Sequence, residues 1–453
     1  MTTRVLVPSG VLGLGFDHAA LARGVAMKPD IICIDGGSTD SGPYSLGAGV
    51  SKYSRAATKS EWRMLMQARA EAGVPLVIGT AGTCGTDSMV DWMYAITLEL
   101  AEELGQSLKV ARLYSSQPLE RIRLAAEAGR IAPLAPAPEL DLSELTNIVA
   151  LAGAEQIQAA LATGADIVIA GRTTDTATIA ALPLLRGEAA GGAWHGAKIA
   201  ECGALCSTNP TSGVIMVGFD TAGFTVTPLA ETAACTPHSV SAHMLYENSD
   251  PFRLYEPGGH LDVTGARYSA IDARSVRVEG SEWVPGPYTV KLEGARVAGY
   301  QTTILAILRN AHYVVHARQW VELLSGFLTG EIRSRMVLDP AEYTLEFRLI
   351  GIDGALGALE NRKGDPVEVG VLGLITARSQ AEASEIGKLI NPFVLHYPLT
   401  DDEELPTFAF PYSPATTDRG ALYEFALNHV MRLDDPMSAF RLEVTSVRMG
   451  GAA

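Results

Sequence analysis

Four short runs of apolar residues near the N-terminus each end in a loop rich in glycine and small polar residues. The runs occupy residues 5–7, 31–34, 76–78 and 167–169. Their continuous β-branched composition is typical of strands buried on both faces of a parallel sheet. The carboxyl ends of such strands open onto one crevice, where ligands of open α/β sheets bind. We therefore expect the four loops to converge on a single site.

Helical patterns alternate with these runs. Apolar residues recur at helical spacing over 58–72 and 89–104. A further strand is expected over 109–113, and Pro118 marks the first turn of a helix. We interpret the proline-rich stretch 132–138 as a connection inside the domain, because the alternation resumes at 147–151. Such alternation implies βαβ crossovers, so we predict an α/β domain over 1–212 with an open, mostly parallel sheet and flanking helices.

Beyond residue 213 the pattern changes and strands outnumber helices. Strands are expected at 213–219, 224–229, 275–278, 288–292, 343–350 and 367–376, and helices near Ser239 and at 302–308, 318–328 and 380–389. Apolar residues alternate with period two over 343–350, which is typical of a half-buried strand. The second half of the chain therefore predicts a C-terminal α+β domain over 213–453.

Charge and composition narrow the classes of partner. The 453 residues carry a formal net charge of −16, and the pI is near 5.1. Nucleic acids and anionic membranes attract basic surfaces, so neither is expected as a partner. No apolar stretch approaches the ~18 residues that span a bilayer, and the N-terminus lacks a signal-peptide core. The five cysteines form no C-x-x-C pair. We expect a cytoplasmic protein, and its apolar content is compatible with a homo-oligomer.

The loop after the second apolar run offers backbone and hydroxyl groups to a ligand. Gly36 and Gly37 allow a ligand to approach the backbone closely. Ser38 and Thr39 supply hydroxyl donors, and Asp40 is a candidate general base. Alternatively, the aspartates of this loop only satisfy turn amides, which is a common role of Asp.

The loop after the third run precedes a predicted helix, whose N-terminus favours an anion. Gly79, Thr80, Gly82 and Thr83 are therefore candidate substrate-binding residues. The alternative is that the helix needs only an N-cap there. Cys84 is a weak candidate nucleophile, because a buried structural thiol is the commoner case.

The fourth loop adds a guanidinium. Arg172 can hold a carboxylate in bidentate fashion. Thr173 beside it is a further candidate binding residue, and Asp175 is a candidate acid or base. The alternative is an internal ion pair between Arg172 and Asp175 or Asp40. Both interpretations place Arg172 at the crevice.

Other motifs bear on catalysis and cofactors. His260 lies between two carboxylates in the segment 256–262 and is a candidate acid or base, because imidazole exchanges protons near neutral pH. Alternatively, the glycine neighbours of His260 only make a turn.

The glycines at 10, 13 and 15 are in the reverse order of the dinucleotide fingerprint, and the histidine spacing does not match a helical zinc site. The sequence thus gives no strong nucleotide or zinc signature. Asp40, Asp87, Asp175 and Glu201 could together hold a magnesium ion through their oxygen atoms.

Several of these motifs together resemble the acyclic terpene utilisation family of AtuA-like proteins. The resemblance rests on residues 35–43, 78–82, 165–172, 255–259 with Asp262, and 292–295 followed by Gly299 and Tyr300. It spans most of the chain. The resemblance implies a part in the bacterial breakdown of acyclic terpenes and related branched carboxylates, without implying a particular reaction.

The candidate residues favour an enzyme that acts on a small acyclic carboxylate, branched or unsaturated, or on its CoA thioester. Arg172 and the loop amides would hold this anionic metabolite, while Asp40, Asp175 or His260 moves a proton beside the carbonyl. We predict a lyase of the hydratase or dehydratase type. An isomerase, a hydrolase or acyl-transferring enzyme with a serine or cysteine nucleophile, and a non-catalytic metabolite-binding subunit are the alternatives.

Overall fold

The apolar runs near the N-terminus form the centre of a ten-stranded sheet. The structure, a computed structural model, describes residues 2–134, 139–362 and 364–448. Five neighbouring strands of the sheet are parallel, in the order β1-β2-β3-β7-β4. Their bounds are β1 Thr3–Val7, β2 Ile31–Asp35, β3 Leu76–Gly79, β7 Ile167–Ala170 and β4 Leu108–Tyr114. Every residue of β2, β3 and β7 is buried, as expected for strands covered on both faces.

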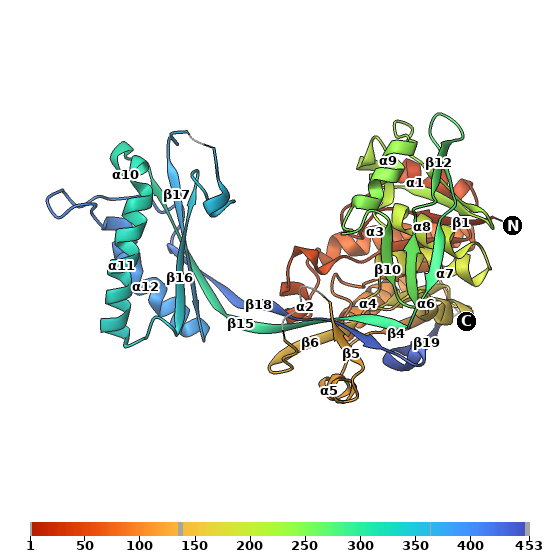
Figure 1. Ribbon diagram of the computed structural model, residues 1–453, viewed down its shortest axis with the longest axis horizontal. Helices are drawn as coiled ribbons and strands as arrows, with labels where there is room; N and C mark the ends of the chain where they lie inside the picture. The colour runs from red at the N-terminus through yellow and green to blue at the C-terminus, as the bar shows by residue number, and fades with distance from the viewer. Residues whose placement is uncertain (1, 135–138, 363, 449–453) are drawn as a thin grey trace. The chain divides into compact units, whose positions relative to one another are not determined.

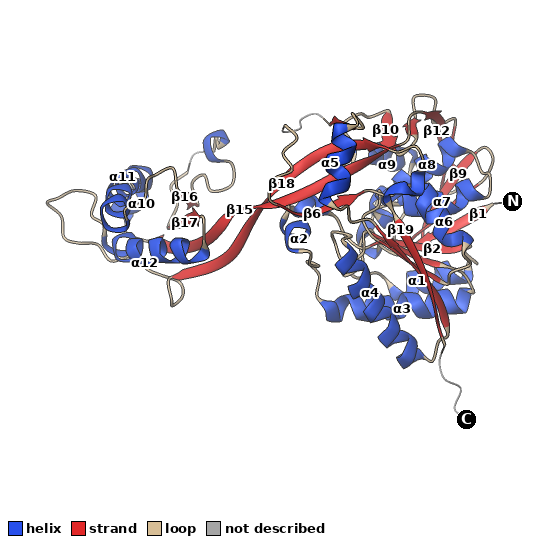
Figure 2. Ribbon diagram, turned by 90° about the horizontal axis from the view of Figure 1, so that it is seen from below, coloured by secondary structure: helices blue, strands red, loops and turns tan. Residues whose placement is uncertain are grey.

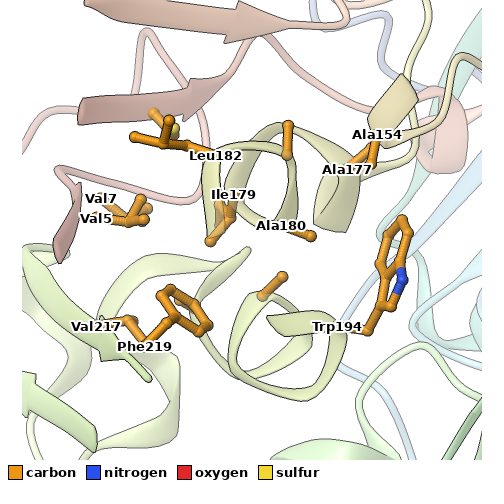
Figure 3. Packing of buried hydrophobic residues seen from close by; sticks show 14 of the residues in the cluster. Val5, Val7, Ala154, Ala177, Ile179, Ala180, Leu182, Trp194, Val217 and Phe219 are labelled. Atoms are coloured by element: carbon orange, nitrogen blue, oxygen red, sulfur yellow. The ribbon is translucent and has the colours of Figure 1, made fainter. Parts of the chain in front are cut away.

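Helices cover both faces of these strands (Figures 1 and 2). One face packs on α1 (His18–Ala26), α3 (Arg55–Ala72) and α4 (Asp87–Leu104), and the other on α6 (Ala154–Ala162), α7 (Asp175–Leu185) and α8 (Ala190–Ala200). Figure 3 shows part of the core on the face covered by α6, α7 and α8, where Val5 and Val7 of β1 lie near Ile179 and Leu182 of α7. Trp194 of α8 belongs to the same core. This layered arrangement confirms the predicted α/β fold class.

Antiparallel strands extend both edges of the parallel centre. On the β1 side these are β8 Ile215–Phe219, β9 Gly223–Pro228, β13 Val276–Glu279 and β12 Arg267–Ala270, and on the β4 side β19 Arg441–Val447. Val5 of β1 pairs directly with Val217 of β8. The domain boundary expected at 212/213 therefore falls inside this sheet. The apolar run of β8 predicts a strand but does not indicate which edge of the sheet the strand joins.

The chain divides into two units, Met1–Arg296 with Phe425–Ala453 and Val297–Glu424. Two long strands, β15 (Thr289–Leu308) and β18 (Thr416–Arg432), each contribute residues to both units. In the first unit, β6 (Leu145–Ala150) pairs with β15 and β5 (Ile131–Pro133) pairs with β18, so β6 does not continue the parallel sheet as the alternation suggested. Of the proline-rich stretch, residues 135–138 lie outside the described residues.

The remaining elements of the first unit are smaller. They include a three-stranded sheet of β10 Arg253–Glu256, β11 Gly259–Asp262 and β14 Glu282–Pro285, and the helices α2 Tyr44–Ala48, α5 Leu119–Glu127 and α9 Pro237–Ala242. None of the described helices has both the length and the apolar character needed to cross a lipid bilayer.

The second unit combines a sheet with helices on one of its faces (Figure 1). Its further elements are β16 Tyr343–Ile350, β17 Val369–Ala377, α10 Ala311–Val315, α11 Ala317–Met336 and α12 Gln380–His396. The helix predicted over 302–308 is wrong, because this segment belongs to β15 and pairs with β17. Thr302, Ile304, Ala306 and Leu308 are all buried, which is the period-two pattern of a strand. A run this short cannot separate strand from helix by its spacing.

Candidate active site

The loops that follow β1, β2, β3 and β7 lie against one another at the carboxyl edge of the parallel strands. The amide of Leu12 donates a hydrogen bond to the carbonyl of Asp35 at 2.9 Å. The amide of Thr83 donates to the carbonyl of Gly36 at 3.0 Å, and the amide of Arg172 donates to the carbonyl of Gly85 at 3.1 Å. The loops thus converge as their positions after parallel strands predict.

These four loops form a tightly packed layer, which we call the loop layer, and their glycines allow the close approach of the backbones. A Cβ atom added at Gly36 would lie 2.5 Å from the carbonyl oxygen of Thr80, and one at Gly79 would lie 2.4 Å from the hydroxyl oxygen of Thr173. Loop amides are also consumed, since Gly36 donates to Gly79 and Thr80 donates to Gly171. Seven residues predicted to bind substrate are buried in this layer: Gly36, Gly37, Gly79, Thr80, Gly82, Thr83 and Thr173. Their main role in the structure is to join the loops.

Arg172 is buried in the same layer and has a protein partner. Its Nε lies 3.0 Å from one carboxylate oxygen of Glu293, and a terminal nitrogen lies 3.3 Å from the other. The terminal nitrogens also donate to the hydroxyls of Thr80 and Thr39 at 3.2 and 3.3 Å. Burial opposes ionisation of Glu293, yet Arg172 and Lys291 lower its pKa to about 2. The bidentate fork of Arg172, which was expected to hold a substrate, therefore holds Glu293. A carboxylate oxygen of Asp175 lies 4.0 Å from a terminal nitrogen of Arg172.

A cavity of about 340 Å³ adjoins this layer, and we call it the site cavity. Five carboxyl-bearing residues line it, namely Asp35, Asp40, Asp175, Glu201 and Glu247. Of the site residues predicted from the sequence, Ser38, Asp40 and Asp175 line the site cavity. The hydroxyl of Ser38 donates to the carboxylate of Asp40, and Ser38 also accepts from the Asp40 amide at 3.0 Å. Thr39 faces a neighbouring cavity, which Asp40 also lines.

Asp35 and Asp175 stand at the end of a strand and at the start of a helix that packs on the sheet. Asp35 is the last residue of β2, and Asp175 is the first residue of α7, after β7. Asp35 is 8% exposed, and its Oδ2 accepts from the Gly37 amide at 3.0 Å. Its Oδ1 has no hydrogen-bond partner among the described residues. Burial, followed by the charge of Asp175, raises the pKa of Asp35 well above its ordinary value. Burial also raises the pKa of Asp175, although Arg172 opposes this shift.

Two further carboxyl groups, those of Glu201 and Glu256, form an acidic cluster with Asp35 and Asp175. Glu201, at the end of α8, forms a buried ion pair with Lys198. Burial, with the charges of Asp175 and Glu256, raises the pKa of Glu201 to about 8 although Lys198 opposes the shift. Glu256, at the end of β10, accepts a hydrogen bond from the Thr176 hydroxyl, and burial raises its pKa to about 7. The cluster therefore holds carboxyl groups that can give or take protons near neutral pH.

Comparison with known families matches the chain to the family described as acyclic terpene utilisation family protein AtuA, over residues 49–400. The chain belongs to this family. The match confirms the resemblance seen in the sequence and includes Asp175, Glu201 and Glu256. Comparisons with curated proteins and with solved structures found no match.

In this AtuA family member, the structure does not bring His260 to the site cavity. His260 lies in β11 directly opposite Tyr255 of β10, and their rings are 5.3 Å apart. Successive side chains of a strand point to opposite faces, so Tyr255 and His260 lie on the face opposite to Glu256. Tyr255 is accordingly exposed and Glu256 buried. Of the residues in this hairpin, Glu256 is the one whose pKa the charge of Asp175 helps to raise.

The carboxylates suggested as magnesium ligands are not gathered in one place. Asp87 accepts from the amide of Ser116 at 3.0 Å and pairs with Arg441 at 3.4 Å, and it is not among the residues that line the site cavity. Among the described residues, no three His, Cys, Asp or Glu side chains are grouped so that they could hold a metal ion. Cys84 is buried beside Thr86, and burial raises the pKa of its thiol, which disfavours a thiolate nucleophile.

Sequence reasoning missed the cation of the site cavity in this family member. Lys52 lines the cavity, is exposed, and donates to the hydroxyl of Ser41 at 3.2 Å. Within the described part of the chain, no ion pair joins Lys52 to a carboxylate. Lys52 lies outside the strand-end loops, so no local pattern pointed to it. The glutamate that holds Arg172, Glu293, was missed because it lies in β15, far along the chain.

Proposed function

We propose that this AtuA family member is an enzyme that acts by acid/base catalysis in the site cavity. Its substrate is a small acyclic carboxylate, branched or unsaturated, or the corresponding CoA thioester, and its reaction is the addition or removal of water. The observation that carries this proposal is the pair formed by Asp35 and Asp175, which line one cavity and have raised pKa values. Buried carboxyl groups that influence each other's titration are typical of acid/base sites.

The two carboxyl groups of the pair differ in their surroundings, which assigns them different roles. Asp175 lies beside the guanidinium of Arg172, which favours its ionised form. Asp35 is the more deeply buried group, and its unpartnered Oδ1 is available to carry a proton. In dehydration, Asp175 takes the proton from the carbon next to the carbonyl, and Asp35 protonates the departing hydroxyl group. Water leaves and a carbon–carbon double bond forms, and hydration runs the same steps in reverse.

Lys52 is the group that holds the negative charge of the substrate in this proposal. It lines the site cavity with no carboxylate partner among the described residues, whereas the fork of Arg172 is filled by Glu293. Arg172 then serves as a positioning residue that keeps Asp175 ionised. A lysine ammonium suits this role, because it binds a carboxylate or phosphate as a point charge.

The proposal is tested with a panel of branched hydroxy acids, unsaturated dicarboxylates and acyl-CoA thioesters in water enriched in oxygen-18. A lyase transfers the label between water and substrate, whereas an isomerase moves the double bond without it. Asp35→Asn and Asp175→Asn should each lower turnover by at least ~100-fold, the low end of the contribution of a general acid or base. Glu71→Gln, an exposed carboxylate on α3, is the matched control and should keep wild-type turnover. Full activity in both aspartate variants would remove the pair from the mechanism.

The panel also separates the alternative functions. A covalent adduct on Ser38, seen by intact mass after an acyl substrate is added, would indicate a hydrolase or acyl-transferring enzyme instead. This alternative has support in the hydrogen bond from Ser38 to Asp40 at the cavity wall. Binding of a metabolite that stabilises the folded state but is not converted would indicate a metabolite-binding subunit.

A further inference from the structure

We infer that the mouth of the site cavity is an apolar subsite that selects the branched hydrocarbon end of the ligand. Four residues from three segments carry it: Val11 and Leu14 of the first loop, Leu205 and Tyr246, which line the same cavity as Asp35 and Asp175. Leu14 is 69% exposed, Leu205 44% and Tyr246 39%. We call these four residues the apolar mouth. This inference rests on the proposed function for the class of ligand.

The loop that carries Leu14 is held so that this side chain stays exposed. Glu61 of α3 accepts hydrogen bonds from the amides of Gly13 and Gly15, at 2.7 and 2.9 Å, on either side of Leu14. Leu12, in contrast, is buried in the core that includes α3. Burial of a carboxylate is costly, and these charge-assisted hydrogen bonds offset the cost. A buried glutamate therefore fixes a loop that presents a leucine to the cavity.

The segment that carries Leu205 is in contact with the same loop. Leu205 belongs to the short helix η2 (Gly203–Cys206), between the buried residues Ala204 and Cys206. The amide of Ala204 donates to the carbonyl of Gly213 at 3.0 Å. A Cβ atom added at Gly10 would lie 3.0 Å from the Cα of Cys202, so the first loop and the start of η2 are in contact. The contact between Gly10 and Cys202 thus links the loop that carries Leu14 to the short helix that carries Leu205.

The site cavity is therefore amphipathic. Its lining has two parts: buried carboxyl groups, Asp35 and Glu201 among them, and the side chains of the apolar mouth. A ligand that matches both parts has a polar, reacting head and an apolar tail. Covering the exposed leucines with the tail removes apolar surface from water, which favours longer and branched chains. The apolar mouth thus sets the chain-length preference, and Glu61 acts as a positioning residue for it.

The test compares the affinities of two non-reactive branched acids, isovaleric acid and citronellic acid, measured by calorimetry. Each fully buried methylene group tightens binding about fourfold. Since the tail is only partly covered, wild-type protein should bind citronellic acid at least ~10-fold more tightly than isovaleric acid. The variants Leu14→Ala and Leu205→Ala should each lower this ratio, and the double variant should bring it below ~3-fold. Leu119→Ala, an exposed leucine on α5 outside the cavity, is the matched control and should keep the wild-type ratio.

Glu61 provides a second, independent arm. Glu61→Ala should lower the same ratio by releasing the Leu14 loop, and Glu61→Gln should restore part of it, because its amide oxygen still accepts one hydrogen bond. An unchanged ratio in the Leu14→Ala/Leu205→Ala variant, or no chain-length preference in the wild type, would overturn the inference. These results are separate from the proposed function, because turnover depends on Asp35 and Asp175 and the affinity ratio does not require turnover.

Discussion

Arg172 acts on the site through its neighbours. Its guanidinium is buried and makes hydrogen bonds to Glu293, Thr80 and Thr39, so its charge is balanced inside the protein. The charge still reaches Asp175, whose ionised form it favours. A buried arginine with protein partners can therefore still influence the pKa of a neighbouring carboxyl group.

At this scale we predict that Arg172→Met lowers the free energy of unfolding by about 3 kcal/mol, because the buried charge of Glu293 loses its bidentate partner and keeps only Lys291. Removing both charges, as in Arg172→Met/Glu293→Leu, should recover most of the loss. Arg123→Met removes an arginine from the exposed ion pairs with Glu120 and Glu127 and should have a far smaller effect. Urea denaturation followed by circular dichroism measures all three. If the free energy of unfolding of Arg172→Met equals that of the wild type, the pair with Glu293 does not hold the loops together.

The elements contribute the geometry of the loop layer. Strands β2, β3 and β7 end side by side, so the loops that follow them are forced into contact. Gly85 shows how tight this contact is, because a Cβ atom added there would lie 2.1 Å from the backbone nitrogen of Arg172. The position of Arg172 therefore depends on the third loop as much as on β7.

A matched pair of glycines tests this packing between elements. Gly85 and Gly73 have nearly the same φ, +63° and +66°, but an added Cβ atom at Gly73, after α3, meets nothing. Gly73→Ala should cost only the left-handed backbone conformation, roughly 1–2 kcal/mol. Gly85→Ala should cost at least ~2 kcal/mol more, because overpacking is added to the same backbone cost. Equal losses of stability in denaturant unfolding would contradict the interlocking of the loops.

The elements also show how far the sequence could be used to predict this structure. The parallel strands and the helices α3 and α4 could be predicted because each has a continuous or periodic apolar pattern. The segment 302–308 could not, because its pairing with β17, far along the chain, makes it part of a strand. Asp40 and Asp175, which line the site cavity, could be named as candidates from their positions after strands. In contrast, Glu293 is 121 residues from Arg172, and the face on which His260 lies depends on its register with Tyr255.

For the whole molecule, the net charge of −16 includes carboxyl groups that differ from ordinary surface acids. Glu201 and Glu256 are buried in the first unit, and their pKa values are raised from 4.5 to about 8 and about 7. Both groups bind protons more tightly in the folded chain than in the unfolded chain. Their contribution to stability is therefore fully present below about pH 4.5 and is lost as the pH rises to about 8.

We accordingly predict that the free energy of unfolding falls between about pH 4.5 and pH 8 through these groups. Glu256→Gln removes one titrating group, so the fall should become smaller by roughly 3 kcal/mol, at about 1.4 kcal/mol for each pKa unit. The exposed control Glu71→Gln should keep the wild-type pH dependence. The measurement is a series of urea unfolding curves across this pH range. A wild-type slope in the Glu256→Gln variant would show that Glu256 is ionised throughout.

The central claim of this account is that Asp35 and Asp175 exchange protons with a ligand in the site cavity. The most direct test is exchange of hydrogen for deuterium at the carbon next to the carbonyl of a branched acyl-CoA thioester, followed by mass spectrometry in heavy water. Wild-type protein and Glu71→Gln should catalyse this exchange, and Asp175→Asn should slow it by at least ~100-fold while remaining folded. Exchange at the wild-type rate in folded Asp175→Asn would contradict the claim.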